Sequence, residues 1–364
     1  MNLSHVSLYR YAIPFTEPIT VKRQRLVQRE GVVLALHHAA GEAIGYGEIA
    51  PLLGLHRESL EQAEAQVVGL LARRTITIPC MMQLHLYPSV RTGLEMAIIN
   101  LHAALSGVFP SFLGEVSGDG DVAAEVPVNA LLFGDTPQVV QRAERYFDLG
   151  YRTFKLKVNV RNCADAITSI RELHRIFGNC IELRIDANQS FTLDEALAFA
   201  SMIPEGSIAY IEEPLQEVES IGEFFAKTGI RSALDETLWQ KPALLATTPN
   251  EALAALILKP NRLGGVVAAL NLARYAREHH LLAVFSSAFE SGISLSFYAW
   301  LAASTASTAA KPAACGLDTY RYLRHDLLTT PFGAERALLN PHKLYRDGAT
   351  LNHSTLRRTS LWTM

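Results

Sequence analysis

The feature that most constrains the fold of this chain is a set of ionisable residues that recur at the ends of successive short apolar runs. These residues stand at or near the carboxyl ends of five consecutive runs and are Lys155 with Lys157, Asp186, Glu212, Asp235 and Lys259. From Lys157 onward the spacings, by subtraction along the sequence, are 29, 26, 23 and 24 residues. One strand, one helix and their loops have about this length, so the pattern favours parallel βαβ units.

Eight short apolar runs in the second part of the chain predict strands. They are Val126 to Leu132, Thr153 to Val158, Ile181 to Asp186, Ile208 to Glu212, Ser232 to Asp235, Ala255 to Lys259, Leu282 to Ser286 and, more weakly, Cys315 to Thr319. Apolar residues at helical spacing lie between them, most clearly in Pro137 to Leu149, Ala164 to Ile176, Leu193 to Met202, Val266 to His279 and Gly292 to Ala303. Eight strands with helical connections predict a closed α/β barrel, and an open doubly wound sheet is the alternative on pattern alone.

The first part of the chain has a different pattern and predicts a smaller α+β domain. Apolar alternation or apolar runs predict strands at Val6 to Ile13 and Val32 to Leu36, and Tyr46 to Pro51 predicts a turn. Helical spacing follows at Ser59 to Leu71 and Gly93 to Leu105. The Gly-, Asp- and Ser-rich segment Leu113 to Ala124 is the expected boundary. We therefore expect domains at residues 1–120 and 121–320, with a C-terminal segment, 321–364, that packs back on the first domain.

Composition excludes several classes of protein. The chain has 364 residues, of which 49% are hydrophobic and 19% charged, and its net charge is −3, which describes a globular protein with a sizeable core. Because no dense Lys/Arg run is present, we expect no nucleic-acid partner. The four cysteines are too far apart for a CxxC site or a disulfide framework. No apolar stretch reaches the length of a membrane span, and the first residues lack a basic region followed by an apolar one, so we expect a cytoplasmic protein without a membrane partner.

The charged residues at the strand ends predict a particular chemistry. Side chains at the carboxyl ends of barrel strands converge on one mouth, so Asp186, Glu212 and Asp235 should meet between the strands of Lys157 and Lys259. Three carboxylates suit Mg²⁺, and Mn²⁺ takes the same ligands. A cation bound to a substrate carboxylate stabilises the negative charge left when a neighbouring carbon loses its proton, and a lysine can remove that proton.

The two-residue period of a strand adds further candidates. Lys155 should face the same way as Lys157, and Arg184 and Asn188 the same way as Asp186. We expect Arg184 to pair with a ligand carboxylate or with substrate. A single Asp or Lys after a strand is usually a loop or cap residue, but five charged positions in register, facing a barrel interior, are hard to explain unless they bind something.

These motifs resemble the muconate-lactonizing subgroup of the enolase superfamily. The residues that carry the resemblance are Lys155-Leu-Lys157, Asp186-Ala-Asn188, Glu212-Glu-Pro214, Asp235-Glu236 and Lys259-Pro-Asn-Arg-Leu-Gly-Gly265. The resemblance spans nearly the whole chain and implies an N-terminal α+β capping domain on a modified (β/α)7β barrel of the TIM type. Within the subgroup, Gly45 to Pro51, Ser286 to Ser291 and Gly316 to Thr319 are similar to the o-succinylbenzoate synthase family.

This resemblance implies a Mg²⁺-dependent lyase that dehydrates a small dicarboxylate in menaquinone biosynthesis. Lys157 would remove a proton, and Lys259 would stabilise the anion from the opposite face. Lys155, as a like charge, would help to keep the pKa of Lys157 low. Backbone N–H groups of Ser286 and Gly316 would hold a substrate carboxylate. The segment Thr16 to Glu30 corresponds to a substrate-closing loop, where Lys22, Arg23, Arg25 and Arg29 would attract a dianion; a solvated basic stretch is the alternative.

Two other functions stay open. An N-acylamino acid racemase or dipeptide epimerase would use Lys157 and Lys259 as bases on opposite faces. Epimerases of the subgroup usually carry an Asp-x-Asp on the last strand, and the corresponding Gly316-Leu-Asp318 lacks the first acid, which argues against this function. The second alternative is a barrel that has lost catalysis and serves as a binding protein. The intact carboxylates and lysines argue against it.

Overall fold

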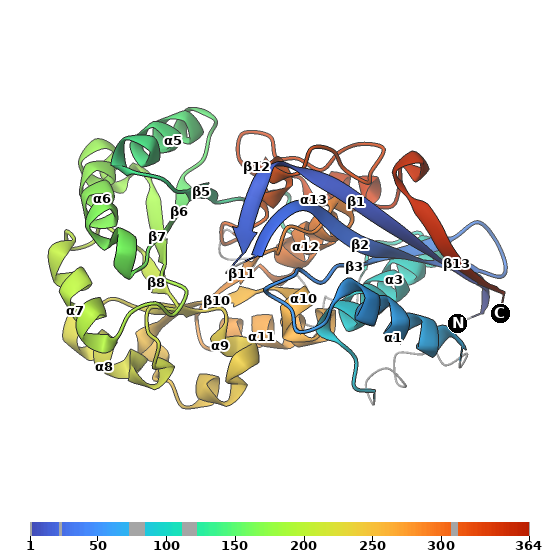
Figure 1. Ribbon diagram of the computed structural model, residues 1–364, viewed down its shortest axis with the longest axis horizontal. Coiled ribbons are helices and arrows are strands. Elements are labelled where there is room, and N and C mark those ends of the chain that lie inside the picture. Colours follow the sequence, from blue (N-terminus) through green and yellow to red (C-terminus); the bar gives the residue numbers. More distant parts are fainter. Residues whose placement is uncertain (1, 22–23, 73–83, 111–121, 307–311, 364) are drawn as a thin grey trace.

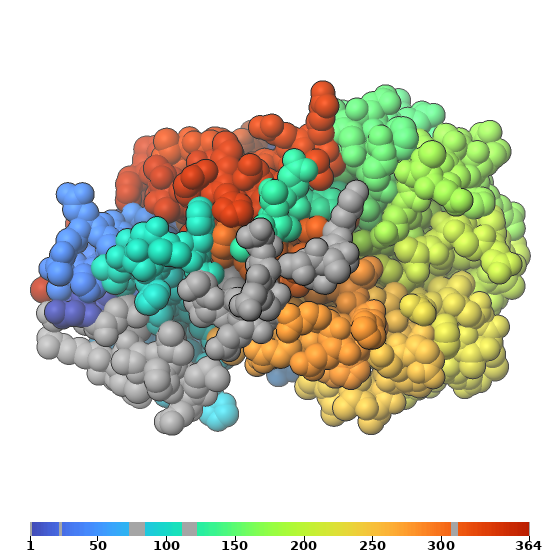
Figure 2. Space-filling model, turned by 180° about the vertical axis from the view of Figure 1, so that it is seen from behind, coloured from blue at the N-terminus to red at the C-terminus, as the bar shows by residue number. Residues whose placement is uncertain are grey.

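The structure is a computed structural model that describes residues 2–21, 24–72, 84–110, 122–306 and 312–363. It is elongated, with a sheet-and-helix domain at one end and a curved parallel sheet wrapped by helices at the other (Figure 1). Seen from behind, the capping helices and the C-terminal segment share one end, and residues of about 130–250 form the opposite end (Figure 2). No helix in the described ranges is long and apolar enough to cross a membrane.

The capping domain is a four-stranded antiparallel sheet packed on two helices. Its strands follow the order β13-β1-β2-β3 and are β13 (Arg357–Thr363), β1 (Leu3–Val21), β2 (Gln24–His38) and β3 (Ile44–Ile49). The helices are α1 (Leu60–Ala72) and α3 (Pro88–Ser106). Alternate residues such as Val6 and Leu8 on β1, and Val32, Leu34 and Leu36 on β2, are fully buried in a core shared with both helices.

The predicted turn at Tyr46 to Pro51 is wrong, because the chain there is strand β3, which pairs antiparallel with β2. Its glycines have a packing role instead of a turn role. A Cβ at Gly45 would lie 2.1 Å from the carbonyl oxygen of Ala97, and one at Gly47 would lie 1.9 Å from that of Gly93. Glycine thus allows α3 to lie directly against the strand.

The second domain is built on seven parallel strands whose spatial order follows the sequence. They are β5 (Ala130–Leu132), β6 (Thr153–Lys157), β7 (Glu182–Asp186), β8 (Tyr210–Glu212), β9 (Ser232–Leu234), β10 (Leu253–Leu258) and β11 (Leu282–Phe285). Two parallel bridges close the ring: Ser286 with Gly316, and Cys315 with Val128. The eighth strand thus consists only of Cys315 and Gly316. The predicted (β/α)7β barrel with a capping domain is confirmed, and the open sheet is excluded.

Helices surround the barrel, and most of them bury one apolar face. They are α5 (Thr136–Asp148), α6 (Cys163–Phe177), α7 (Leu193–Met202), α8 (Ile221–Thr228), α9 (Thr237–Gln240), α10 (Pro260–Leu263), α11 (Val266–Glu278), α12 (Gly292–Thr305) and α13 (Pro341–Asp347). Capping boxes start α5, at Asp135, and α7, at Thr192. Helix α12 is buried on all sides because it lies between barrel and capping domain. A short pair, β4 (Val126–Pro127) with β12 (Leu338–Leu339), lies beside the barrel.

The expected closing loop at Thr16 to Glu30 is largely the β1–β2 hairpin, whose strands run to Val21 and from Gln24. Next to this hairpin, Phe15 of β1 forms an antiparallel bridge with Leu323, which follows the eighth strand. Lys22 and Arg23 lie outside the described residues, as does most of the expected boundary at Leu113 to Ala124.

Candidate active site

Adjacent barrel strands bring the predicted acids and lysines to one mouth. In the ladder, Lys157 pairs with Asp186 and Asp186 with Glu212, so these three side chains lie side by side on β6, β7 and β8. Asp235 directly follows β9 and Lys259 directly follows β10. Both stand where their strands end, which places all five residues at the carboxyl face of the sheet.

The lysines and carboxylates form two groups of ion pairs, one around Asp186 and one around Asp235. The Lys155 Nζ lies 2.7 Å from both carboxylate oxygens of Glu212 and 2.9 Å from Asp186 Oδ2. The Lys157 Nζ lies 3.0 Å from Asp186 Oδ2 and donates to Asn188 Oδ1 at 2.8 Å. Lys259 donates to Asp235 Oδ2. The structure therefore brings together the three carboxylates, the three lysines and Asn188.

Burial distinguishes the lysines from one another. The three carboxylates are 1–2% exposed, and the side chains of Lys155 and Lys259 are 16% and 14% exposed. Lys157 is 48% exposed. Its amine is thus the one that a molecule entering the mouth meets first.

Mutual charge sets the ionisation of the cluster. Burial opposes the ionised form of Asp186, but the ammonium groups of Lys155 and Lys157 hold its pKa below the usual value. Burial and the negative charge of Asp186 raise the pKa of Glu212, and burial raises that of Asp235 well above its usual range, since Lys259 offsets it only in part. Burial disfavours the charged form of Lys259, yet Asp235 and Glu212 raise its pKa. Lys259 is therefore a firmly held ammonium.

Two polar residues outside the predicted site, Glu213 and Gln189, fix the position of Asp235. Glu213 is buried and accepts hydrogen bonds from the backbone N–H of Asp235 at 2.7 Å and of Thr237 at 2.8 Å. Gln189 also donates to Glu213, at 2.8 Å. Asn188, Gln189 and Glu213 all have left-handed backbones, with φ between 45° and 57°. Such conformations are strained for these residue types and persist where the surroundings hold them.

Arg184 does not reach the carboxylates at the mouth. Its guanidinium pairs with Glu182 at 2.6 Å, donates to the carbonyl of Ala314 at 2.7 Å and lies over the ring of Tyr210. Arg184 and Glu182 precede Asp186 on the same inward face of β7, so Arg184 lies one layer deeper in the barrel. The expected pairing with a ligand carboxylate is absent from the described contacts, and Arg184 holds barrel strands together instead.

Ser286 and Gly316 lie at the mouth, but their backbone N–H groups are engaged in closing the barrel. Ser286 N–H donates to Leu258 O, and Gly316 N–H donates to Phe285 O, both at 2.9 Å. The expectation that these two N–H groups bind substrate is therefore wrong for this structure. A Cβ at residue 316 would lie 2.5 Å from Ser286 Oγ, so glycine is needed for the close approach. The hydroxyl of Ser286 remains as the group that can reach a ligand.

The donor set fits a divalent cation. Within the described ranges, no three His, Cys, Asp or Glu side chains are grouped as a ready-made cage. Ammonium groups of Lys155 and Lys259 lie against the carboxylates instead. However, Asp186, Glu212 and Asp235 supply only hard oxygen donors, and Asp235 Oδ1 is buried with no hydrogen-bond partner. A cation would satisfy that oxygen and relieve the mutual repulsion of the acids.

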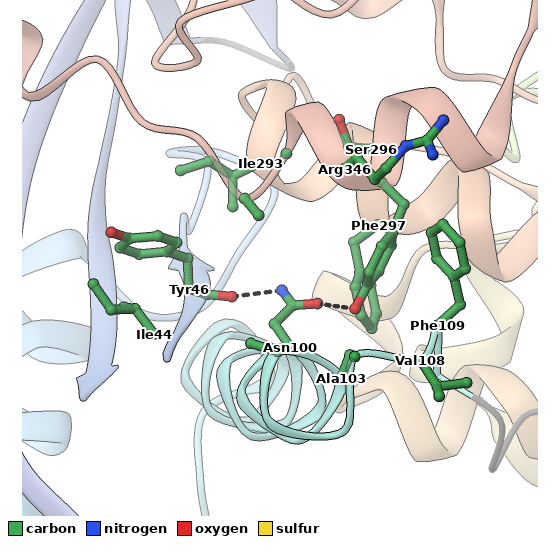
Figure 3. Close-up of a pocket in the computed structure, with 15 residues that line it drawn as sticks. Ile44, Tyr46, Asn100, Ala103, Val108, Phe109, Ile293, Ser296, Phe297 and Arg346 are labelled. Carbon is green, nitrogen blue, oxygen red and sulfur yellow. Dashed lines mark hydrogen bonds between the residues drawn. The ribbon is translucent and has the colours of Figure 1, made fainter. Parts of the chain in front are cut away.

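A separate cavity of about 420 Å³ lies where the capping domain meets α12 and α13. Its walls are mainly apolar, and Asn100 links the two sides by donating to Tyr46 O at 2.7 Å and accepting from the Tyr345 hydroxyl at 2.6 Å (Figure 3). None of the predicted site residues lines it. The chemistry therefore belongs at the barrel mouth.

Two family models match the chain. "Enolase C-terminal domain-like" matches residues 138–343, and "MenC, N-terminal domain" matches residues 3–101. Solved structures agree with this fold. A member of the enolase superfamily from Roseovarius nubinhibens, complexed with magnesium, has a TM-score of 0.83, 17% identity and covers 100% of this chain and 99% of that one. The L-Ala-D/L-Glu epimerase from Bacillus subtilis has a TM-score of 0.80 and 18% identity, with 93% and 96% covered. The fold and the family models thus define an enzyme of the enolase superfamily.

Relatives narrow this class. The o-succinylbenzoate synthase of Edwardsiella ictaluri is 31% identical, over 90% of this chain and 93% of that protein. The chloroplastic protein PHYLLO of Arabidopsis thaliana is 32% identical over 92% of this chain, which spans only 22% of that longer protein. The chain belongs to the o-succinylbenzoate synthase family of the enolase superfamily, and this membership makes it an enzyme of the hydro-lyase class.

Proposed function

We propose that the enzyme dehydrates 2-succinyl-6-hydroxy-2,4-cyclohexadiene-1-carboxylate to o-succinylbenzoate, in menaquinone biosynthesis, with Mg²⁺ as cofactor and Mn²⁺ able to replace it. The observation that carries this proposal is the arrangement of one open lysine, Lys157, and one enclosed ammonium, Lys259, around three buried carboxylates. The choice of substrate is supported by relatives in the family that are named o-succinylbenzoate synthase.

In this mechanism Lys157 acts first as a base. Its Nζ, as the free amine, removes the proton from the ring carbon that bears the carboxylate, and the electron pair of the broken C–H bond moves onto that carboxylate. Mg²⁺, held by Asp186, Glu212 and Asp235, would stabilise this negative charge. The protonated Lys157 then returns the proton to the departing hydroxyl group. Water leaves from the same face, the electron pair enters the ring and the ring becomes aromatic.

The other residues keep the anion and the base in place. Lys259, held charged by Asp235, would face the anion from the other side, and no proton transfer is required of it. Lys155 binds both Glu212 and Asp186 and so fixes the two acids relative to each other. Asn188 bonds the amine of Lys157 at 2.8 Å, which orients that amine. The hydroxyl of Ser286 would contact the substrate.

The test is an ultraviolet assay of diene loss and aromatic product formation with purified protein and Mg²⁺. EDTA should abolish turnover because it removes Mg²⁺. Lys157→Met should lower turnover by about 10²-fold or more, because the proton acceptor is lost. Since Lys157 is half exposed, its replacement should leave the melting temperature close to wild type. No turnover by folded, Mg²⁺-treated protein would sink the proposal.

Dipeptide epimerisation is the second candidate, because dipeptide epimerases share the fold and because two lysines flank the acids. One contact disfavours it. Asp318, which lies two residues after the last strand, accepts from the Tyr151 hydroxyl at 2.7 Å and from Arg321 at 2.8 Å, so it is already engaged. Proton exchange from both faces of a dipeptide in D₂O, with loss of exchange from one face in Lys259→Ala, would favour the epimerase.

A further inference from the structure

Two buried charges of the capping domain contact the barrel segment that carries Ser286. Arg29 on β2 and Glu48 on β3 are 1% and 2% exposed. The segment in question, residues 286–291, joins the end of β11 to the start of α12. Neither charged residue reaches the carboxylates or lysines of the mouth through any described contact, so the proposed mechanism uses neither of them.

Arg29 grips main-chain carbonyls from both domains. Its Nε donates to the carbonyl of Phe289 at 3.0 Å, and its other nitrogens donate to the carbonyls of Glu30, Pro51 and Ala50. The planar guanidinium can serve these acceptors at once because its five N–H groups point outward in a fixed fork. An ammonium in the same place has three donors around one nitrogen and cannot span them.

The carbonyl that Arg29 holds belongs to a strained residue. Phe289 has a left-handed backbone, with φ of 61°, which is unusual for an aromatic side chain. Its ring lies edge-on to those of Phe15 and Tyr322. A strained residue of this kind persists only where the surroundings fix it. The bend of the 286–291 segment therefore depends on the capping domain.

Glu48 fixes the far end of the same segment. Its carboxylate accepts from the backbone N–H of Ser291 at 3.0 Å and of Ser294 at 3.2 Å, at the start of α12, and from the hydroxyl of Tyr11. The first N–H groups of a helix have no partner within it, so a carboxylate there is favourable. Here the cap comes from another domain.

The same buried group also contacts helix α10, which begins directly after Lys259. Glu290 accepts from the side chain of Asn261 at 2.9 Å, and Asn261 donates to Ala50 O at 2.8 Å. Burial, together with Glu48, raises the pKa of Glu290, and the charge of Arg29 opposes this. Arg29 thus balances two buried acids as well as binding carbonyls.

We propose that Arg29 and Glu48 are positioning residues that hold the 286–291 segment in the shape needed to bind the substrate. Arg29 is then a clamp, and not a surface charge that attracts the dianion. This inference rests on the proposed function for its kinetic consequence. Its structural consequence, a fixed 286–291 segment, can be measured without substrate.

The experiment compares Arg29→Lys and Glu48→Gln with wild type. Arg358→Lys is the matched control, because Arg358 is exposed on β13 of the same capping-domain sheet and the change keeps its charge. Kinetics with the diene and Mg²⁺ are measured alongside hydrogen exchange of the backbone amides of residues 286–291. Because the segment should bind the substrate equally in ground and transition states, we expect KM to rise about tenfold or more with kcat within about threefold. The segment's amides should exchange about tenfold faster, while those of β6 to β10 stay protected.

Several outcomes separate the two proposals. A lower melting temperature with wild-type KM and wild-type exchange in both variants would show that the cluster only stabilises the fold, and would overturn the inference. If the wild type does not convert the diene but the backbone amides of residues 286–291 exchange faster in the variants, the positioning role of Arg29 and Glu48 is supported and the proposed function is refuted. Should Arg29→Lys fail to fold, the isosteric Glu48→Gln alone decides.

Discussion

His56 should make the stability of this enzyme fall on mild acidification. It lies in the loop between β3 and α1, where its Nδ1 accepts from the backbone N–H of Leu52 at 2.9 Å. Its Nε2 meets the carbonyl of Asn261, two residues beyond Lys259, at 3.0 Å and must donate to it. One acceptor and one donor nitrogen define a neutral ring. Protonation would place a second N–H against that of Leu52.

The size of the effect follows from the pKa. Burial, with Arg262 and Arg29 nearby, lowers the pKa of His56 to about 3. In the unfolded chain the pKa of the same imidazole is about 6.5, so the unfolded chain binds the proton more readily. The stabilisation of the folded state by neutral His56 is therefore complete above pH 6.5 and is lost as pH falls toward 3. At pH 5 the loss is about 2 kcal/mol.

Urea denaturation of wild type and His56→Gln at pH 7 and pH 5 measures this loss. Glutamine keeps one donor and one acceptor but does not titrate, so the fall in unfolding free energy between the two pH values should be about 2 kcal/mol smaller in the variant. Comparing the variants cancels the contribution of other groups, including Glu213, whose pKa burial raises to about 7. Equal pH dependence in the two proteins would refute the neutral, buried His56.

Three further results are expected. At a hundred times its Kd, Mg²⁺ should stabilise the wild type by about 2.7 kcal/mol, which is seen as a higher melting temperature. Asp186→Asn should abolish this rise. An equal rise in both proteins would place the cation elsewhere. Lys155→Met should lower the unfolding free energy by roughly 3 kcal/mol in urea titrations, since Glu212 and Asp186 lose their shared ammonium, and a loss below about 1 kcal/mol would contradict that pairing. Gly47→Ala should destabilise the fold strongly by pushing α3 from β3, whereas Gly69→Ala, where a Cβ meets nothing within 4 Å, should leave the melting temperature unchanged or raise it.

Much of the barrel was predictable because five successive strands, β6 to β10, end at or next to a charged residue of the site. Seven predicted runs coincide with strands to within a few residues, and the charges at their ends meet in space. The eighth, Cys315 to Thr319, shrinks to the two bridging residues Cys315 and Gly316. The period of two correctly placed Lys155 beside Lys157.

The failures have a common physical cause, which is contact between distant parts of the chain. The segment Tyr46 to Pro51 predicts a turn locally, but Gly45 and Gly47 lie in strand β3, where α3 packs directly against them. Arg29 predicts a surface charge, but its side chain donates to the carbonyls of Ala50 and Pro51, just after β3, and to that of Phe289. For Arg184 the strand period gives the correct face and leaves the depth undefined. These contacts are set by tertiary packing, which no local pattern encodes.

The pairing of β13 with β1 affects how the protein can be assembled and rearranged. In this ladder His5 lies opposite Thr363, so β1 leaves the ribosome well before the strand that covers its edge. Until then one edge of β1 is bare, which invites pairing with other chains and favours slow folding. The same closeness allows residues 5 and 363 to be joined by a short linker. A circular permutant opened elsewhere would make the two strands neighbours in synthesis and should shorten the time for which that edge is exposed.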